Sequence, residues 1–123
     1  MRALVVDDSK AMRSIVGRIV KQLGFELREA VHGKDALEQL RAAGTMDLVL
    51  VDWNMPEMNG YEFVRAVRSE PAFDELRIMM ITTEAALPQM AQALEAGANE
   101  YLIKPFTAEA LRGKLEMIGL QLE

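Results

Sequence analysis

Apolar residues in this chain follow two alternating patterns: short continuous runs, and longer stretches in which they recur at helical spacing. The short runs are bounded by polar or turn residues and predict strands at 3–6, 48–51, 78–81 and 101–103, and the segment 25–30 has a weaker strand pattern. The stretches between them predict helices at 33–43, 60–69 and 87–96, one between Ser9 and Gly24, and one after Thr107. Strand and helix therefore alternate along the whole chain, with no linker or low-complexity segment between them.

The predicted helices carry recognisable start and stop residues. Ser9 and Thr107 are good N-caps, and Gly24, Gly44 and Gly97 are good stops. The residues expected to face the core are Met12, Ile15, Val16, Ile19, Val20 and Leu23 in the first helix, Ala36, Leu37 and Leu40 in the second, Phe63, Val64 and Val67 in the third, and Leu111, Leu115 and Ile118 in the last.

Strands that alternate with helices favour a parallel sheet with right-handed crossovers. The run 48–51 is continuously apolar, as expected of a central strand buried on both faces. In such sheets, ligands bind beyond the carboxyl ends of the strands. Asp7 and Asp8 follow the first strand, Asp52 follows the third and Lys104 follows the fifth. The pattern predicts that these charged residues meet at one edge of the sheet.

Composition narrows the class of protein further. The chain has 123 residues, the size of one domain, and a net charge of -5, which argues against nucleic acid as a partner. It has no cysteine, no leader-like start and no apolar run long enough to span a membrane. We expect a soluble, cytoplasmic domain with no membrane partner.

The acidic cluster indicates a metal-assisted reaction. Three neighbouring carboxylates repel one another unless they take up protons or share a cation, and an all-oxygen ligand set favours Mg²⁺. Asp52 is the best nucleophile, since a rigidly held carboxylate can attack phosphorus. Lys104 can neutralise charge on the transferred group, and the hydroxyl of Thr82, at the end of the fourth strand, can donate to it.

Four motifs in this order resemble one known family over essentially the whole chain. They are Val5-Val6-Asp7-Asp8-Ser9, Asp52-Trp53-Asn54-Met55-Pro56 with Gly60, Ile81-Thr82-Thr83-Glu84-Ala85, and Tyr101-Leu102-Ile103-Lys104-Pro105-Phe106. The chain resembles the receiver domain of bacterial two-component response regulators, with the single-domain chemotaxis members as its nearest match. The resemblance implies a single-domain, doubly wound α/β fold of the flavodoxin-like class, (βα)5, with a five-stranded parallel sheet in the order 2-1-3-4-5. It also implies that 1–123 is one receiver domain without an output domain.

The resemblance further implies roles for individual residues. Asp52 would be the phosphoacceptor, and Mg²⁺ would be bound by Asp8, Asp52 and the backbone carbonyl of Asn54, with Asp7 acting partly through water. Lys104 would pair with Asp52 at rest and with the phosphoryl group afterwards, and the Lys104–Pro105 bond would be cis.

The same resemblance implies a switch. Thr82 would move towards the phosphoryl group and Tyr101 would turn inward, while Asn54 and Glu84 would tune hydrolysis of the acyl phosphate. Thr83 lies where many relatives carry a smaller residue, and its stiff side chain leads to the hypothesis that Thr83→Ala changes the coupling between phosphorylation and Tyr101.

The implied partners are a sensor histidine kinase, as phosphodonor, and a downstream protein such as a motor or switch protein. The downstream protein would bind the face made by the fourth helix, the fifth strand and the fifth helix. The protein would be a monomer that acts in chemotaxis or motility, and it would not be an enzyme beyond its own phosphorylation and dephosphorylation. The basic side of the first helix is either a solvated face or a docking site for an acidic or phosphorylated partner; its residues are Lys10, Arg13, Arg18 and Lys21.

Several alternatives remain at this stage. The chain can be the receiver of another phosphorelay or a fragment of a longer regulator. A magnesium phosphatase of the haloacid dehalogenase class needs a second aspartate where this chain has Asn54, and a flavodoxin that binds FMN needs a phosphate loop where it has Asp7 and Asp8. His32 is expected to be a solvated loop residue away from the site.

Overall fold

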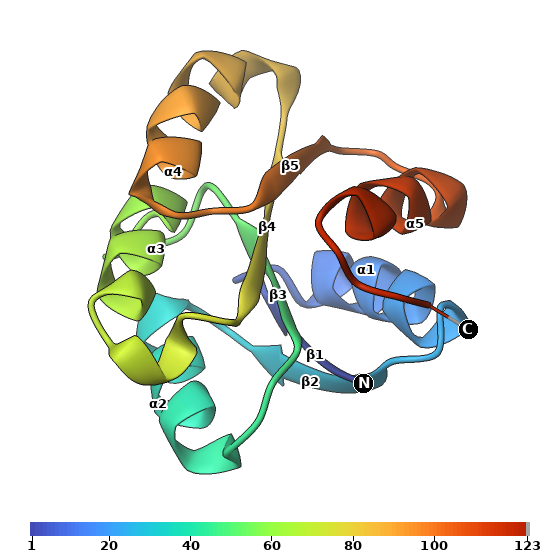
Figure 1. Ribbon diagram of the computed structural model, residues 1–123. Helices are drawn as coiled ribbons and strands as arrows, with labels where there is room; N and C mark the ends of the chain where they lie inside the picture. Colours follow the sequence, from blue (N-terminus) through green and yellow to red (C-terminus); the bar gives the residue numbers. More distant parts are fainter. Residues whose placement is uncertain (123) are drawn as a thin grey trace.

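The computed structural model describes residues 1–122, which form a parallel sheet covered by helices on both faces (Figure 1). The strands are β1 (Arg2–Val6), β2 (Glu26–Ala30), β3 (Leu48–Asp52), β4 (Arg77–Thr82) and β5 (Glu100–Ile103). They run in the order β2-β1-β3-β4-β5, all parallel, so the predicted fold class and strand order are confirmed.

The helices divide between the two faces of the sheet. α1 (Lys10–Gln22) and α5 (Ala108–Met117) cover one face, and α2 (Gly33–Ala43), α3 (Gly60–Arg68) and α4 (Met90–Ala96) cover the other (Figure 1). Successive residues of the buried strand β3 alternate between the two resulting cores: Val49 and Val51 pack towards α2, α3 and α4, and Leu48 and Leu50 pack towards α1 and α5. This strand is buried on both sides, as its continuous apolar run predicted. No helix within 1–122 is both long and apolar enough to cross a membrane.

The predicted helix caps are confirmed. The Ser9 hydroxyl accepts a hydrogen bond from the backbone N–H of Met12 at 3.2 Å, and the Thr107 hydroxyl accepts one from Ala110 at 3.1 Å. Since these bonds satisfy N–H groups that the helix cannot pair internally, they fix where α1 and α5 begin. Both helices start just beyond a strand that carries predicted site residues.

The predicted fourth helix, 87–96, is only partly correct. Residues Glu84–Gln89 form a 3-10 helix, η2, and the α-helix begins at Met90. Pro88 lies inside η2, where it has no N–H to donate to an α-helical hydrogen bond. The segment after β4 is therefore a tighter turn followed by a short helix.

Two side-chain predictions also need correction. Ile15 belongs to the apolar repeat of α1 but is 52% exposed, because it lies at the edge of the helix's apolar face. His32 is half-buried and is the N-cap of α2, where its Nδ1 accepts a hydrogen bond from the Asp35 N–H at 3.1 Å. It has a structural role and is not a solvated loop residue.

Arg68, at the end of α3, ties several segments together. Its guanidinium donates to backbone carbonyls in two segments, the connection between α3 and β4 and the end of α4, and to the side chain of Asn99. The acceptors are Phe73 O (2.6 Å), Leu76 O (2.7 Å), Gly97 O (3.0 Å) and Asn99 Oδ1 (3.0 Å). Arg68 thereby fastens the C-terminal end of α4 to α3 and to the start of β4.

Candidate functional site

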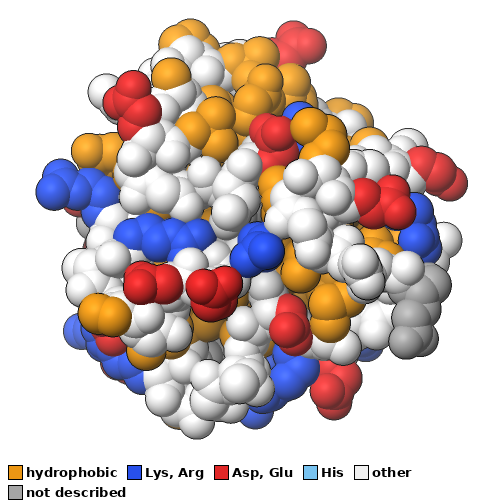
Figure 2. Space-filling view, in the orientation of Figure 1, with side chains coloured by type: hydrophobic (Ala, Val, Ile, Leu, Met, Phe, Trp, Pro, Cys, Tyr) orange, Lys and Arg blue, Asp and Glu red, His pale blue; other side chains and the backbone are white. Residues whose placement is uncertain are grey.

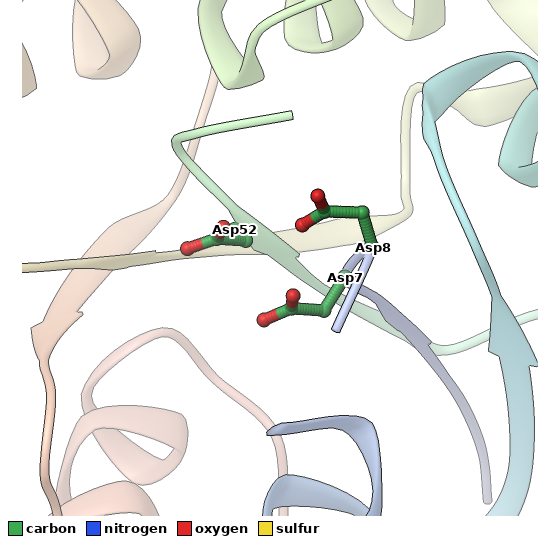
Figure 3. A group of neighbouring side chains, drawn as sticks. All are labelled: Asp7, Asp8 and Asp52. Carbon is green, nitrogen blue, oxygen red and sulfur yellow. The ribbon is translucent and has the colours of Figure 1, made fainter. Parts of the chain in front are cut away.

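Three carboxylates lie together at the carboxyl edge of the sheet. Asp7 and Asp8 follow β1, and Asp52 ends the neighbouring strand β3, whose Val51 pairs with Val6. Each of the three offers an oxygen, and these oxygens lie within 4.8 Å of one another (Figure 3). Asp7 and Asp52 are only 4% and 6% exposed, whereas Asp8 is exposed. The structure thus brings together the acids that the strand ends predicted.

Lys104 completes the cluster from the other side. It follows β5, and its backbone N–H donates to Thr82 O at 2.7 Å, which continues the pairing with β4. Its Nζ lies 2.8 Å from Asp52 Oδ1 and 3.8 Å from Asp7 Oδ2. The peptide bond from Lys104 to Pro105 is cis, as the resemblance implied. The predicted pairing of Lys104 with Asp52 is present in the structure.

Burial dominates the electrostatics of this cluster. It raises the pKa of Asp52, against the hydrogen bond from Lys104, and the charge of Asp7 raises it further. Burial likewise raises the pKa of Asp7, against its hydrogen bond from the Ser9 N–H at 2.9 Å and the charge of Lys104. One lysine therefore does not compensate three acids, and the protein alone holds excess negative charge at this edge.

The donor set fits a hard divalent cation. The candidate ligands are carboxylate oxygens, with no histidine or cysteine in the cluster, and oxygen ligands are those that Mg²⁺ prefers. The exposure of Asp8 leaves one side open, which suits an ion that keeps several of its water ligands.

The remaining predicted site residues lie in the segments after β3 and β4 (Asn54 and Glu84), at the end of β4 (Thr82) and within β5 (Tyr101). Asn54 and Glu84 are exposed. Thr82 is buried, and its hydroxyl donates to the carbonyl of Thr83 at 3.2 Å. Tyr101 is half-buried, with the Lys114 Nζ 4.8 Å from the centre of its ring. The structure places all four residues on the same edge of the sheet as Asp52 or on the strand leading to it.

Gly60 allows the loop after Asp52 to fold closely over the sheet. Its N–H donates to the Trp53 carbonyl at 3.0 Å. A Cβ at this position would collide with the Met80 methyl group and would lie 3.2 Å from the Trp53 Cα. Glycine at position 60 therefore lets the start of α3 approach Asp52 and Trp53 closely, and a larger residue would require Met80 and the loop to shift.

Sequence reasoning missed one residue of this site. The sequence predicts Arg13 on the basic side of α1, either solvated or in a docking site, but its side chain is only 12% exposed and turns towards the loop after β1. Its Nη1 donates to the Asp7 carbonyl at 2.7 Å, and its Nε lies 3.1 Å from Glu29 Oε1. The sequence indicates this contact only indirectly. Parallel pairing of β1 with β2 places Glu29 beside Val5, just before Asp7 and Asp8, where an acidic side chain can pair with Arg13.

Comparison with known proteins identifies the family. The profile of the response regulator receiver domain matches residues 3–116. The chain belongs to this family. The receiver domain is 47% identical to chemotaxis protein CheY1 of Helicobacter pylori, over 96% of each chain. It is 42% identical to chemotaxis protein CheY of Pseudomonas aeruginosa, over 96% of this chain and 95% of the relative.

A solved structure gives the same result for the fold. Chemotaxis response regulator CheY4 of Vibrio cholerae superimposes with a TM-score of 0.85 at 35% identity, covering 95% of this chain and 97% of that one. The resemblance stated from the motifs is thus confirmed: this is a receiver domain of the CheY type, a class of two-component signalling protein. The roles of individual residues remain predictions.

Proposed function

We propose that this receiver domain is a signalling switch that is turned on by phosphorylation of Asp52. The observation that carries the proposal is the pairing of the buried Asp52 with Lys104, 2.8 Å apart, beside two further carboxylates. A carboxylate Oδ of Asp52 attacks the phosphorus of a phosphohistidine on a sensor kinase. The P–N bond breaks, the imidazole leaves with a proton from solvent, and Asp52 becomes an acyl phosphate.

Mg²⁺ is the cofactor that the site suits. Asp8, Asp52 and the backbone carbonyl of Asn54 would hold the ion, with Asp7 contributing partly through water. When bound, the ion neutralises negative charge on the carboxylates and on the phosphoryl oxygens. Lys104 contributes a second positive charge and can follow the phosphoryl oxygens once Asp52 is modified.

The switch begins at Thr82. In the unmodified protein its hydroxyl donates to the Thr83 carbonyl, a weak partner that a phosphoryl oxygen can replace. Movement of Thr82 towards Asp52 would leave room for the Tyr101 ring to turn inward. Glu84 and Asn54, which flank the site, would tune hydrolysis of the acyl phosphate.

The output surface would be the face of α4, β5 and α5. Apolar side chains gather over η2 and α4 in this view (Figure 2), and Leu94 of α4 is among the exposed large apolar residues. Tyr101 lies on the neighbouring strand, so its rotation would change this face. The similarity to chemotaxis proteins supports a downstream target in chemotaxis or motility.

The phosphodonor would approach from the side of α1. An apolar hollow of about 300 Å³ lies next to the site, lined by Met12, Ile15, Val16, Ile19, Lys104, Pro105 and Phe106. Because it includes Lys104, a kinase domain seated there would reach Asp52. Replacing the exposed Ile15 with Asp is expected to slow phosphotransfer from the kinase and to leave phosphorylation by a small-molecule donor unchanged. Equal slowing with both donors would place docking elsewhere.

The test of the function itself is intact mass after mixing the protein with acetyl phosphate and Mg²⁺. We expect one phosphoryl adduct that is absent in Asp52→Asn and in the presence of a chelator. The matched control is Asp74→Asn, which makes the same substitution at an exposed aspartate outside the cluster and should leave the adduct intact. An adduct on Asp52→Asn, or none on the wild type, would refute the proposal.

A further inference from the structure

Arg13 contacts the acidic loop in a way that the proposed reaction does not use directly. The residue lies in the first turn of α1, and its side chain turns back towards the end of β1. Its Nη1 donates to the carbonyl of Asp7 at 2.7 Å, and its Nε pairs with Glu29 Oε1 at 3.1 Å. With only 12% of the side chain exposed, the guanidinium is held in one place by Glu29 on β2 and by Asp7 in the loop after β1.

The carbonyl that Arg13 binds belongs to the peptide group that joins Asp7 to Asp8. The N–H of Asp7 donates to Ala30 O at 3.2 Å, and its carboxylate accepts from the Ser9 N–H at 2.9 Å. Arg13 therefore supplies the third fixed point of Asp7, on the side of the chain that leads to Asp8. Because a peptide group is planar, fixing its carbonyl oxygen also fixes the direction in which the Asp8 Cα leaves.

The charge of Arg13 is unsuited to a direct role in binding a cation. A guanidinium close to a Mg²⁺ site would repel the ion, and removing it should tighten binding if charge were all that mattered. Glu29 offsets this charge, and the parallel register brings it there, since Val5 pairs with Glu29 and Val6 with Ala30. Because Glu29 offsets the charge of Arg13, the guanidinium can donate a directed hydrogen bond to the Asp7 carbonyl while the pair exerts little net electric field at the cation site.

We infer that Arg13 is a positioning residue of the phosphoacceptor site: its guanidinium holds the Asp7 carbonyl so that the carboxylates of Asp7 and Asp8 face Asp52. The inference rests on the proposed function, because it assigns Arg13 to the Mg²⁺ affinity of that same site. Residues that orient metal ligands from outside typically change metal affinity by about tenfold or more when they are lost.

The test is a Mg²⁺ titration of the unphosphorylated protein, followed by the fluorescence of Trp53, which adjoins Asp52. Arg13→Met is expected to raise the dissociation constant for Mg²⁺ about tenfold. Arg13→Lys keeps the charge but cannot make both contacts, and should raise it by a smaller factor. The matched control is Arg41→Met, which breaks the exposed Arg41–Glu70 pair between α2 and the segment after α3 and should leave Mg²⁺ affinity unchanged.

The outcomes separate three roles. A purely structural Arg13 would lower the melting temperature and leave the Mg²⁺ affinity alone, and an Arg13 that acts by charge would give tighter binding in Arg13→Met and no change in Arg13→Lys. Either result overturns the inference. If Arg13→Met does not fold, the Arg13→Lys affinity decides the question, since only positioning predicts a loss there.

A second measurement separates affinity from chemistry. At saturating Mg²⁺, Arg13→Met should be phosphorylated by acetyl phosphate at close to the wild-type rate, because Asp52 and Lys104 are unchanged. A wild-type protein that shows no Mg²⁺ response would refute the proposed function, and this inference with it. A normal wild-type response with unchanged affinity in both Arg13 variants would refute the inference alone.

Discussion

Glu57 adopts a backbone conformation that costs free energy, and replacing it with glycine should stabilise the receiver domain. It lies in the loop between Asp52 and α3 with φ at 67°, and it is the one non-glycine residue with positive φ within 1–122. The left-handed conformation costs about 1–2 kcal/mol for a residue with a Cβ. Glycine has no Cβ and avoids that cost, but its greater freedom in the unfolded chain lowers the free energy of unfolding by about 0.5–1 kcal/mol.

The net gain for Glu57→Gly is therefore about 0.75 kcal/mol, the difference between the midpoints of these two costs. At about 2.1 cal/mol/K per residue, the unfolding entropy of a chain this long is roughly 0.26 kcal/mol/K, so the melting temperature should rise by about 2–4 °C. Calorimetry in the presence of a chelator would measure this rise without any contribution from Mg²⁺.

Glu57→Ala is the control for this prediction. It removes the same exposed charge and side chain but keeps the Cβ, so it should melt close to the wild type. If the glycine variant melts no higher than the alanine variant, the positive φ does not limit stability, and the reasoning is wrong.

Three further predictions concern the site. Asp52→Asn should unfold less readily than the wild type at pH 7 in a chelator. Burial raises the Asp52 pKa above the unfolded value of 3.8. The cost of its buried charge is therefore absent below pH 3.8 and grows as pH rises through the folded pKa. Urea unfolding at several pH values should show the difference in stability between Asp52→Asn and the wild type shrinking in acid. Lys104→Met should lower the free energy of unfolding by about 3 kcal/mol at pH 7 without Mg²⁺, because it leaves the buried Asp52 carboxylate without the lysine ammonium group. This loss of stability should shrink in acid, and a pH-independent loss in the same urea assay would contradict the prediction. Gly60→Ala should cost about 1–3 kcal/mol, because its Cβ meets Met80, and a circular dichroism melt equal to wild type would show that the loop can shift.

The fold was predictable because its signals are local. Apolar runs mark the inner strands most clearly, and the burial of β3 agrees: all five residues of Leu48–Asp52 are buried. Ser9 and Thr107 mark helix starts through bonds to residues three positions away. The acidic cluster was predictable for a related reason, since parallel strands end at one edge and each acid directly follows a strand.

The missed features depend on where side chains turn in three dimensions. Arg13 has the spacing of a basic face, and its inward turn depends on contacts with the Asp7 carbonyl and with Glu29, sixteen positions away, which the spacing does not reveal. Ile15 fits the apolar period but lies at the edge of the helix face, where the period cannot decide exposure. The sequence signal for the division of 84–96 into η2 and α4 is Pro88, which has no N–H for an α-helical hydrogen bond.

The hydrogen bonds of the Arg68 guanidinium limit how α4 can move. One end of this helix is anchored: Gly97 is bonded to Arg68, which is itself bonded to Phe73 and Leu76. The other end joins η2, which has no side-chain cap and contains Pro88. If phosphorylation moves Thr82 as proposed, we therefore expect the displacement to be confined to η2 and the start of α4, while the C-terminal end of α4 stays in place.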